Sequence, residues 1–92
     1  MGGTTTLLQS TAVPLRPRER VWATGDRPTG ALIVCKGAVT VSTFTAGGSQ
    51  RVIGVSTRGV AIGIDDVIDG GSRRSEVEVV IPGTALYVRG TF

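Results

Sequence analysis

The chain has 92 residues, which suits one compact domain and excludes a second. Hydrophobic residues make up 40% of the chain, but only one Trp, one Tyr and two Phe are present, so aliphatic side chains must fill a modest core. The formal net charge is +3, from ten basic and seven acidic residues. Because this excess is small and no basic block or interleaved aromatic run occurs, the sequence does not indicate a nucleic-acid-binding protein.

Enzymatic activity is not expected, because the chain has no histidine to act as general base or metal ligand. The carboxylates Asp65, Asp66 and Asp69 lack the ligand spacing of a calcium-binding loop, and we interpret them as a solvated turn. We therefore predict no catalytic residue, no metal site and no cofactor.

The cysteine and hydropathy patterns indicate a cytoplasmic protein. A single cysteine, Cys35, excludes a disulfide framework, and its apolar run 31–35 predicts a buried thiol. The longest uncharged run, 37–50, is too polar to cross a membrane. Residues 1–18 lack the continuous apolar centre of a signal peptide, so no membrane contact is expected.

Abundant Gly, Val, Ile and Thr favour strands and turns over helices. Residues 1–11 are interpreted as a flexible leader and residues 12–92 as the folded domain. An edge strand is expected around Leu15, followed by strands at 19–24, 31–35, 38–45, 50–55, 60–64, 75–81 and 84–89.

Short, evenly spaced strands predict an all-β fold, an antiparallel jelly-roll or double-stranded β-helix sandwich of about eight strands with little helix. Lys36-Gly37 is predicted to close a hairpin between 31–35 and 38–45, and Pro82-Gly83 to form the last turn.

Segment 62–77 combines a glycine-bracketed acidic turn, an arginine pair and a strand-like run. A bound phosphate group is best held by a bidentate arginine, backbone N–H groups at a short helix start, and small residues that allow close approach. The candidate ligand-binding residues are Gly63, Gly71, Ser72, Arg73, Arg74 and Ser75.

In order and spacing, the chain resembles a cyclic-nucleotide-binding domain of the bacterial catabolite-activator type. The residues that carry the resemblance are Glu19-Arg20-Val21-Trp22, Gly25-Asp26, Ala31-Leu32-Ile33-Val34, Lys36-Gly37, Gly63, Asp69-Gly70-Gly71-Ser72-Arg73 and Gly83-Thr84-Ala85-Leu86-Tyr87-Val88. The resemblance implies that Gly63 belongs to a phosphate-binding cassette, but Ile64 stands where a ribose-binding Glu is expected. Arg73 matches the phosphate-binding arginine by its spacing from Gly63, whereas Arg74 matches it by the following serine.

Two functions remain open. The first is a degenerate module that acts as a docking, regulatory or oligomerisation domain of a larger bacterial protein or assembly, with other protein domains or a second copy as partners. The second is a sensor of a cyclic nucleotide or small anion through Arg73 or Arg74. Ile64, and the absence of closing helices after the last predicted strand, favour the first.

The arginine pair has an alternative role as a solvent-facing pair that balances Asp65, Asp66 and Asp69. If it is a phosphate clamp, replacing both arginines with alanine should weaken ligand binding more than about tenfold. The same replacement is expected to leave the stability of the fold almost unchanged.

Overall fold

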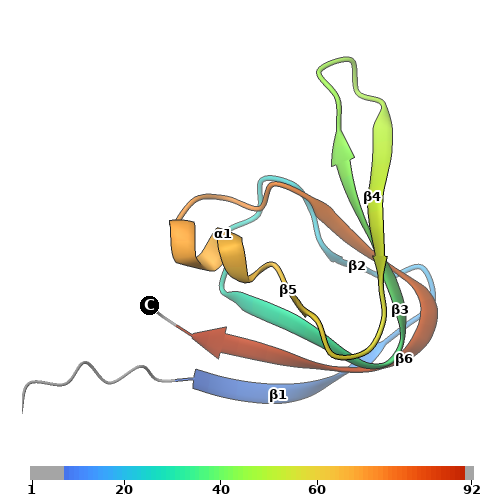
Figure 1. Cartoon of the computed structure of the whole chain (residues 1–92), viewed down its shortest axis with the longest axis vertical. Coiled ribbons are helices and arrows are strands. Elements are labelled where there is room, and N and C mark those ends of the chain that lie inside the picture. The colour runs from blue at the N-terminus through green and yellow to red at the C-terminus, as the bar shows by residue number, and fades with distance from the viewer. Residues whose placement is uncertain (1–7, 91–92) are drawn as a thin grey trace, which may run out of the picture.

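The computed structural model describes residues 8–90, which form six strands and one short helix (Figure 1). The elements are β1 (Leu8–Leu15), β2 (Arg20–Trp22), β3 (Gly30–Phe44), β4 (Gln50–Ser56), β5 (Ala61–Ile62), α1 (Ile64–Asp69) and β6 (Glu76–Gly90). Residues 8–11 belong to β1, which corrects the prediction that they are part of a flexible leader. Residues 1–7 lie outside the described part.

All strand pairs are antiparallel, and the sheet has the order β1-β6-β3-β4. β2 pairs with β6, and β5 pairs with β3. β1 and β4 therefore lie at the two ends of the sheet order, which confirms the edge strand predicted around Leu15.

Two predicted turns are bends within single long strands. β3 and β6 each run for 15 residues and pair with each other, with register shifts between Val34 and Val39. At the bend Gly37 has φ 102°, and a Cβ there would collide with the carbonyl oxygen of Ile81. The predicted hairpin at Lys36-Gly37 is therefore wrong, because Gly37 permits close contact between two bent strands and does not reverse the chain.

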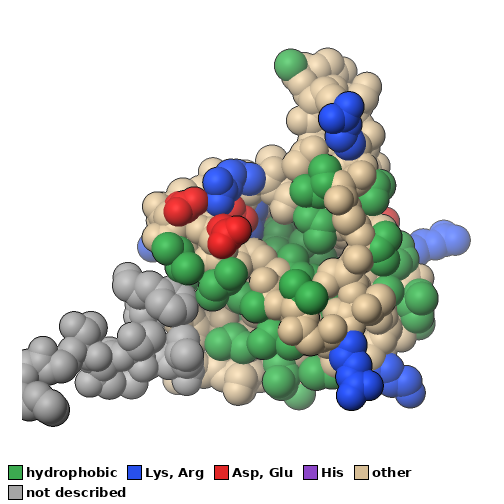
Figure 2. Space-filling model, viewed as in Figure 1, with side chains coloured by type: hydrophobic (Ala, Val, Ile, Leu, Met, Phe, Trp, Pro, Cys, Tyr) green, Lys and Arg blue, Asp and Glu red, His purple; other side chains and the backbone are tan. Residues whose placement is uncertain are grey.

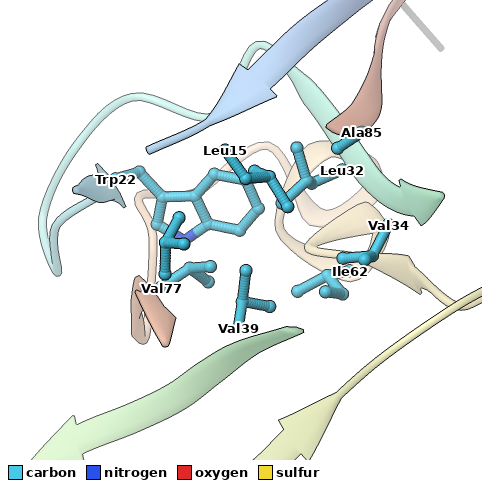
Figure 3. Packing of buried hydrophobic residues seen from close by; sticks show 9 residues of the cluster. Leu15, Trp22, Leu32, Val34, Val39, Ile62, Val77 and Ala85 are labelled. Atoms are coloured by element: carbon cyan, nitrogen blue, oxygen red, sulfur yellow. The ribbon is translucent and has the colours of Figure 1, made fainter. Parts of the chain in front are cut away.

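The bends fold the sheet into two facing layers (Figure 1). The first half of β3 and the second half of β6 pair with β5 and β1, and their other halves pair with β4 and β2. The core lies between the layers (Figure 3) and comprises Leu15, Trp22, Leu32, Val34, Val39, Ile62, Val77, Val79 and Ala85. This confirms the predicted antiparallel β-sandwich, with six continuous strands in place of about eight.

Cys35 is exposed, so the predicted buried thiol is wrong. Leu32 and Val34 are buried, whereas Ile33 is half-buried and Cys35 faces outward. From Leu32 to Cys35 the side chains therefore alternate between the core and the surface, as expected along a strand, whereas Ala31 is buried as well. Within residues 8–90, the structure has no helix with the length and hydropathy to cross a membrane.

Candidate functional site

The predicted cassette folds as a short helix between two glycines that adopt left-handed backbone conformations. α1 follows Gly63, with φ 83°, and ends at Gly70, with φ 74°. The Gly70 N–H donates to the carbonyl oxygen of Asp66 and closes the last turn. The helix brings Asp66 and Asp69 onto one side, three positions apart, facing the arginine pair that follows.

Arg73 lies inside the domain, with 2% of its surface exposed. Its Nη1 donates to the carbonyl oxygen of Gly63 at 2.8 Å, and its Nη2 donates to the carbonyl oxygen of Gly30 and, at 3.4 Å, to the hydroxyl of Tyr87. The guanidinium also stacks on the Trp22 ring, 3.7 Å from the ring centroid. These contacts show Arg73 as a cross-link between the cassette and strands β2, β3 and β6.

The main chain of Arg73 is held as firmly as its side chain. Its N–H donates to the carbonyl oxygen of Asp26 at 2.8 Å, and its carbonyl oxygen accepts from the Gly25 N–H at 2.8 Å. The nearest carboxylate is that of Asp66, 3.7 Å from Nη1, and it balances the buried charge.

Gly63 is required by the space around Arg73 and Trp22. A Cβ at this position would lie 2.7 Å from the Trp22 ring and closer still to the Arg73 guanidinium. The positive φ of 83° adds a second reason, since residues with a side chain rarely adopt it. Gly63 therefore shapes the inner packing of the cassette, a role that the sequence did not reveal.

Arg74 lies on the outer side of the cassette, with 64% of its side chain exposed. Its Nε donates to Asp66 Oδ1 at 2.8 Å, and its Nη2 donates to Asp69 Oδ2 at 2.8 Å. The hydrogen bond and charge of Asp66, followed by the charge of Asp69, raise the pKa of the Arg74 guanidinium. Arg74 thus fits the predicted role of balancing the acidic turn, whereas Arg73 does not face solvent at all.

The structure divides five of the six predicted site residues between two places. Gly71, Ser72 and Arg74 line a shallow depression of about 220 Å³ together with Asp66 and Asp69. Gly63 and Arg73 contact each other on the inner side of the cassette. Ser75 is half-buried just before β6 and does not line the depression. The assignment of these residues to a ligand stays a prediction.

Asp66 is the residue that the sequence analysis misjudged. It is buried, with 6% exposed, and contacts both arginines, whereas Asp65 and Asp69 are exposed as a solvated turn requires. The interval of three residues between Asp66 and Asp69 was the available signal, because it places two carboxylates on one helix face. Among residues 8–90, no group of three or more acidic, Cys or His side chains is positioned to hold a metal ion.

Solved structures share the fold. A Ruegeria pomeroyi protein assigned as a cyclic nucleotide binding protein aligns with a TM-score of 0.81 and 22% identity, over 86% of this chain and 35% of its own. The Thermus thermophilus catabolite activator protein aligns with a TM-score of 0.75 and 22% identity, over 89% of this chain and 37% of its own. This chain therefore spans about a third of the length of these relatives.

A cAMP-bound EAL enzyme also aligns, with a TM-score of 0.79 and 19% identity, over 86% of this chain and 21% of its own. No curated protein matches the sequence. The family model for the cyclic nucleotide-binding domain matches residues 12–91, nearly the whole chain. The chain therefore belongs to the cyclic nucleotide-binding domain family.

Proposed function

We propose that this chain is a non-catalytic module of the cyclic nucleotide-binding family whose cassette does not bind a nucleotide and which docks other protein surfaces within a larger bacterial protein or assembly. The observation that carries this proposal is that the guanidinium groups of both arginines are already bound to protein acceptors. Arg73 donates to protein carbonyl groups inside the domain, and Arg74 donates to two carboxylates. Neither guanidinium presents an uncompensated charge to a phosphate.

Recruiting Arg73 to a ligand would dismantle part of the fold. The guanidinium would have to leave the carbonyl oxygens of Gly63 and Gly30 and the face of Trp22. A buried acceptor that loses its donor costs about 1–3 kcal/mol. A single phosphate contact of comparable strength does not offset two such losses together with the lost stacking.

Recruiting Arg74 would require a phosphate to displace two carboxylates. Both lie 2.8 Å from Arg74 nitrogens, and Asp65 adds a third negative charge on the same short helix. A phosphate that enters this depression therefore meets like charges as well as the arginine. The side chain of the half-buried Ile64 has no oxygen with which to accept a hydrogen bond from a ribose hydroxyl.

An exposed apolar strand supports the docking role. β4 lies at one end of the sheet order, and its residues Val52, Ile53 and Val55 are 56%, 58% and 65% exposed. β4 and the end of β3 form a hairpin that projects from the domain (Figure 1), and Figure 2 shows hydrophobic side chains gathered near the base of this hairpin. Edge strands with exposed apolar side chains are surfaces on which another chain can pair or pack.

A second function, sensing of a cyclic nucleotide or small anion through Arg74, is favoured by one observation. Arg74 is exposed beside Gly71 and Ser72, which are small enough to allow a phosphate to approach the main chain. In that case the ligand would replace Asp66 and Asp69 as the partner of the guanidinium.

Calorimetric titration with cyclic AMP and cyclic GMP at low salt separates the two functions, because low ionic strength favours any anion site. We expect no binding heat at millimolar nucleotide from a chain whose fold is verified by circular dichroism. An Arg74→Ala variant is the matched control and should behave in the same way. Micromolar binding by the natural chain that disappears in Arg74→Ala would overturn the proposal and establish the sensor.

A further inference from the structure

We propose that the groove bordered by β1, β2, the 23–29 loop and the end of β6 binds an extended acidic segment of a partner protein. This inference goes beyond the proposed function, because it concerns a different surface and holds whether or not the cassette binds a nucleotide. The groove has a volume of about 570 Å³, within the usual range of ligand-sized pockets.

The charge of the groove is strongly positive. Five arginines and two carboxylates line it, so it carries an excess of positive charge. Two of the arginines have partners, since Arg20 pairs with Glu76 at 2.8 Å and Arg73 is held inside the domain. Within residues 8–90, Arg16, Arg27 and Arg89 have no carboxylate at ion-pair distance.

These three arginines come from separate parts of the chain. Arg16 follows β1, Arg27 lies in the 23–29 loop, and Arg89 lies near the end of β6. Asp26 cannot balance all three, because it carries a single negative charge and lies within ion-pair distance of none of them. The convergence of uncompensated guanidinium groups on one groove indicates an anionic occupant that supplies carboxylates.

The floor of the groove is apolar. Leu15, Trp22 and Leu32 lie there and belong to the core. On one wall, Thr29 and Tyr87 share a hydrogen bond of 2.7 Å, which fixes the tyrosine ring. The half-buried Val13 and Val21 also line the groove and present the accessible apolar surface above this core. An occupant with apolar side chains between its acidic ones would pack them there and leave its carboxylates at the arginine rim.

The shape of the surface favours an extended chain over a compact ligand. A second depression of about 240 Å³ shares Val13, Tyr87 and Arg89 with the groove and continues to Gln9 and Thr11. The combined surface therefore follows β1 for most of its length. Because β1 stands at the end of the sheet order, its outer edge is open to another strand.

A nucleic acid fits this surface less well. Trp22 is 6% exposed and already stacks with Arg73, so it offers no free ring face to a base. These features favour the peptide.

The test is a fluorescence anisotropy titration of the full chain with a labelled peptide that alternates glutamate and leucine and matches the eight residues of β1. We expect binding that weakens as salt is raised. The variant Arg27→Gln with Arg89→Gln should bind about tenfold more weakly, because two charge-assisted contacts are lost. Arg51→Gln with Arg58→Gln is the matched control, since both arginines are exposed outside the groove, and it should stay within about twofold of the natural chain.

Four results would overturn the inference. No binding of the acidic peptide at millimolar concentration by the folded chain would exclude such a site. Equal losses in the two double variants would mean a diffuse effect of net charge, and equal binding of a glutamine-leucine peptide would mean apolar contact alone. Tighter binding of a single-stranded DNA of similar length, lost in the groove variant, would identify a nucleic-acid surface. None of these results depends on the cassette, so the nucleotide titration remains an independent test.

Discussion

The cassette and the groove contain the same kinds of charged residue but differ in how the charges are paired. In the cassette, Arg74 has carboxylate oxygens of Asp66 and Asp69 at 2.8 Å, and Figure 2 shows acidic and basic side chains side by side near α1. In the groove, Arg27 and Arg89 have no such partner within residues 8–90. The cassette resembles a ligand site, but its arginine charge is balanced by its own carboxylates. The groove resembles no known motif, and three of its arginines lack carboxylate partners within residues 8–90.

The arginine pair shows the same contrast at the scale of two adjacent residues. Arg73 is 2% exposed, whereas the Arg74 side chain is 64% exposed. A buried charge depends on its fixed partners, because removing one of them leaves the others unpaired. An exposed charge keeps water as a substitute partner. Removing one or the other of these neighbouring, chemically identical side chains is therefore expected to change the stability of the fold by different amounts.

The largest effect is expected from Arg73→Ala. It leaves the carbonyl oxygens of Gly63 and Gly30 without their Arg73 donor, and it removes the cation from the Trp22 ring. Asp66 loses one of its two arginine partners and keeps Arg74. Loss of one partner of a buried pair costs about 3–5 kcal/mol. Urea unfolding monitored by Trp22 fluorescence would measure this loss.

Arg74→Ala is the matched control, and we expect a much smaller change in unfolding free energy. Equal losses in the two variants would contradict the division of roles. This expectation also corrects the sequence-based one, in which replacing both arginines barely alters stability, because that reasoning placed both side chains in contact with solvent or ligand.

Much of the fold could be predicted, because alternation of apolar side chains along a strand is a local signal. Every predicted strand overlaps an observed one. The errors are at Lys36-Gly37 and Pro82-Gly83, where a glycine and its neighbour can either reverse a chain or permit two strands to bend in contact. Only the pairing of β3 with β6 distinguishes these outcomes, and that pairing joins distant residues.

The site could be predicted only as a list of residues. The sequence placed Gly63 and the arginine pair in one short segment, but the direction of each side chain could not be predicted from it. Arg73 is oriented by Trp22 and Gly30, which lie far from it in sequence. Part of the groove's charge is visible in the sequence, because Arg16, Arg20 and Arg27 crowd the N-terminal third of the chain. Arg73 and Arg89 join them only through the fold.

A second effect on stability, overlapping in size with that of Arg73→Ala, is expected from Gly63→Ala. The new methyl group must tolerate a φ of 83° and would lie 2.7 Å from the Trp22 ring. Backbone strain of this kind costs about 1–3 kcal/mol, and overpacking adds a comparable amount.

Gly70→Ala is the control, because Gly70 has a similar φ of 74° but a Cβ added there would meet nothing within 4 Å. Thermal unfolding of both variants would isolate the contribution of packing against Trp22 and Arg73. Identical shifts in Tm would mean that Gly63 is required by its backbone alone.

The smallest change in stability is expected from Asp69→Asn. This substitution makes the cassette more like the groove, because it leaves an arginine with fewer carboxylate partners. Asp69 and Arg74 have side chains 58% and 64% exposed, so their ion pair contributes little to folding. The substitution leaves Asp66 to balance Arg73 but removes one of the two carboxylates that hold Arg74. We expect inorganic phosphate, titrated by NMR at low salt, to shift the amide signals of Gly71, Ser72 and Arg74 in this variant and not in the natural chain. Equal shifts in both would mean that the carboxylates do not exclude an anion from Arg74, and the cassette would then be a site that a phosphate can enter.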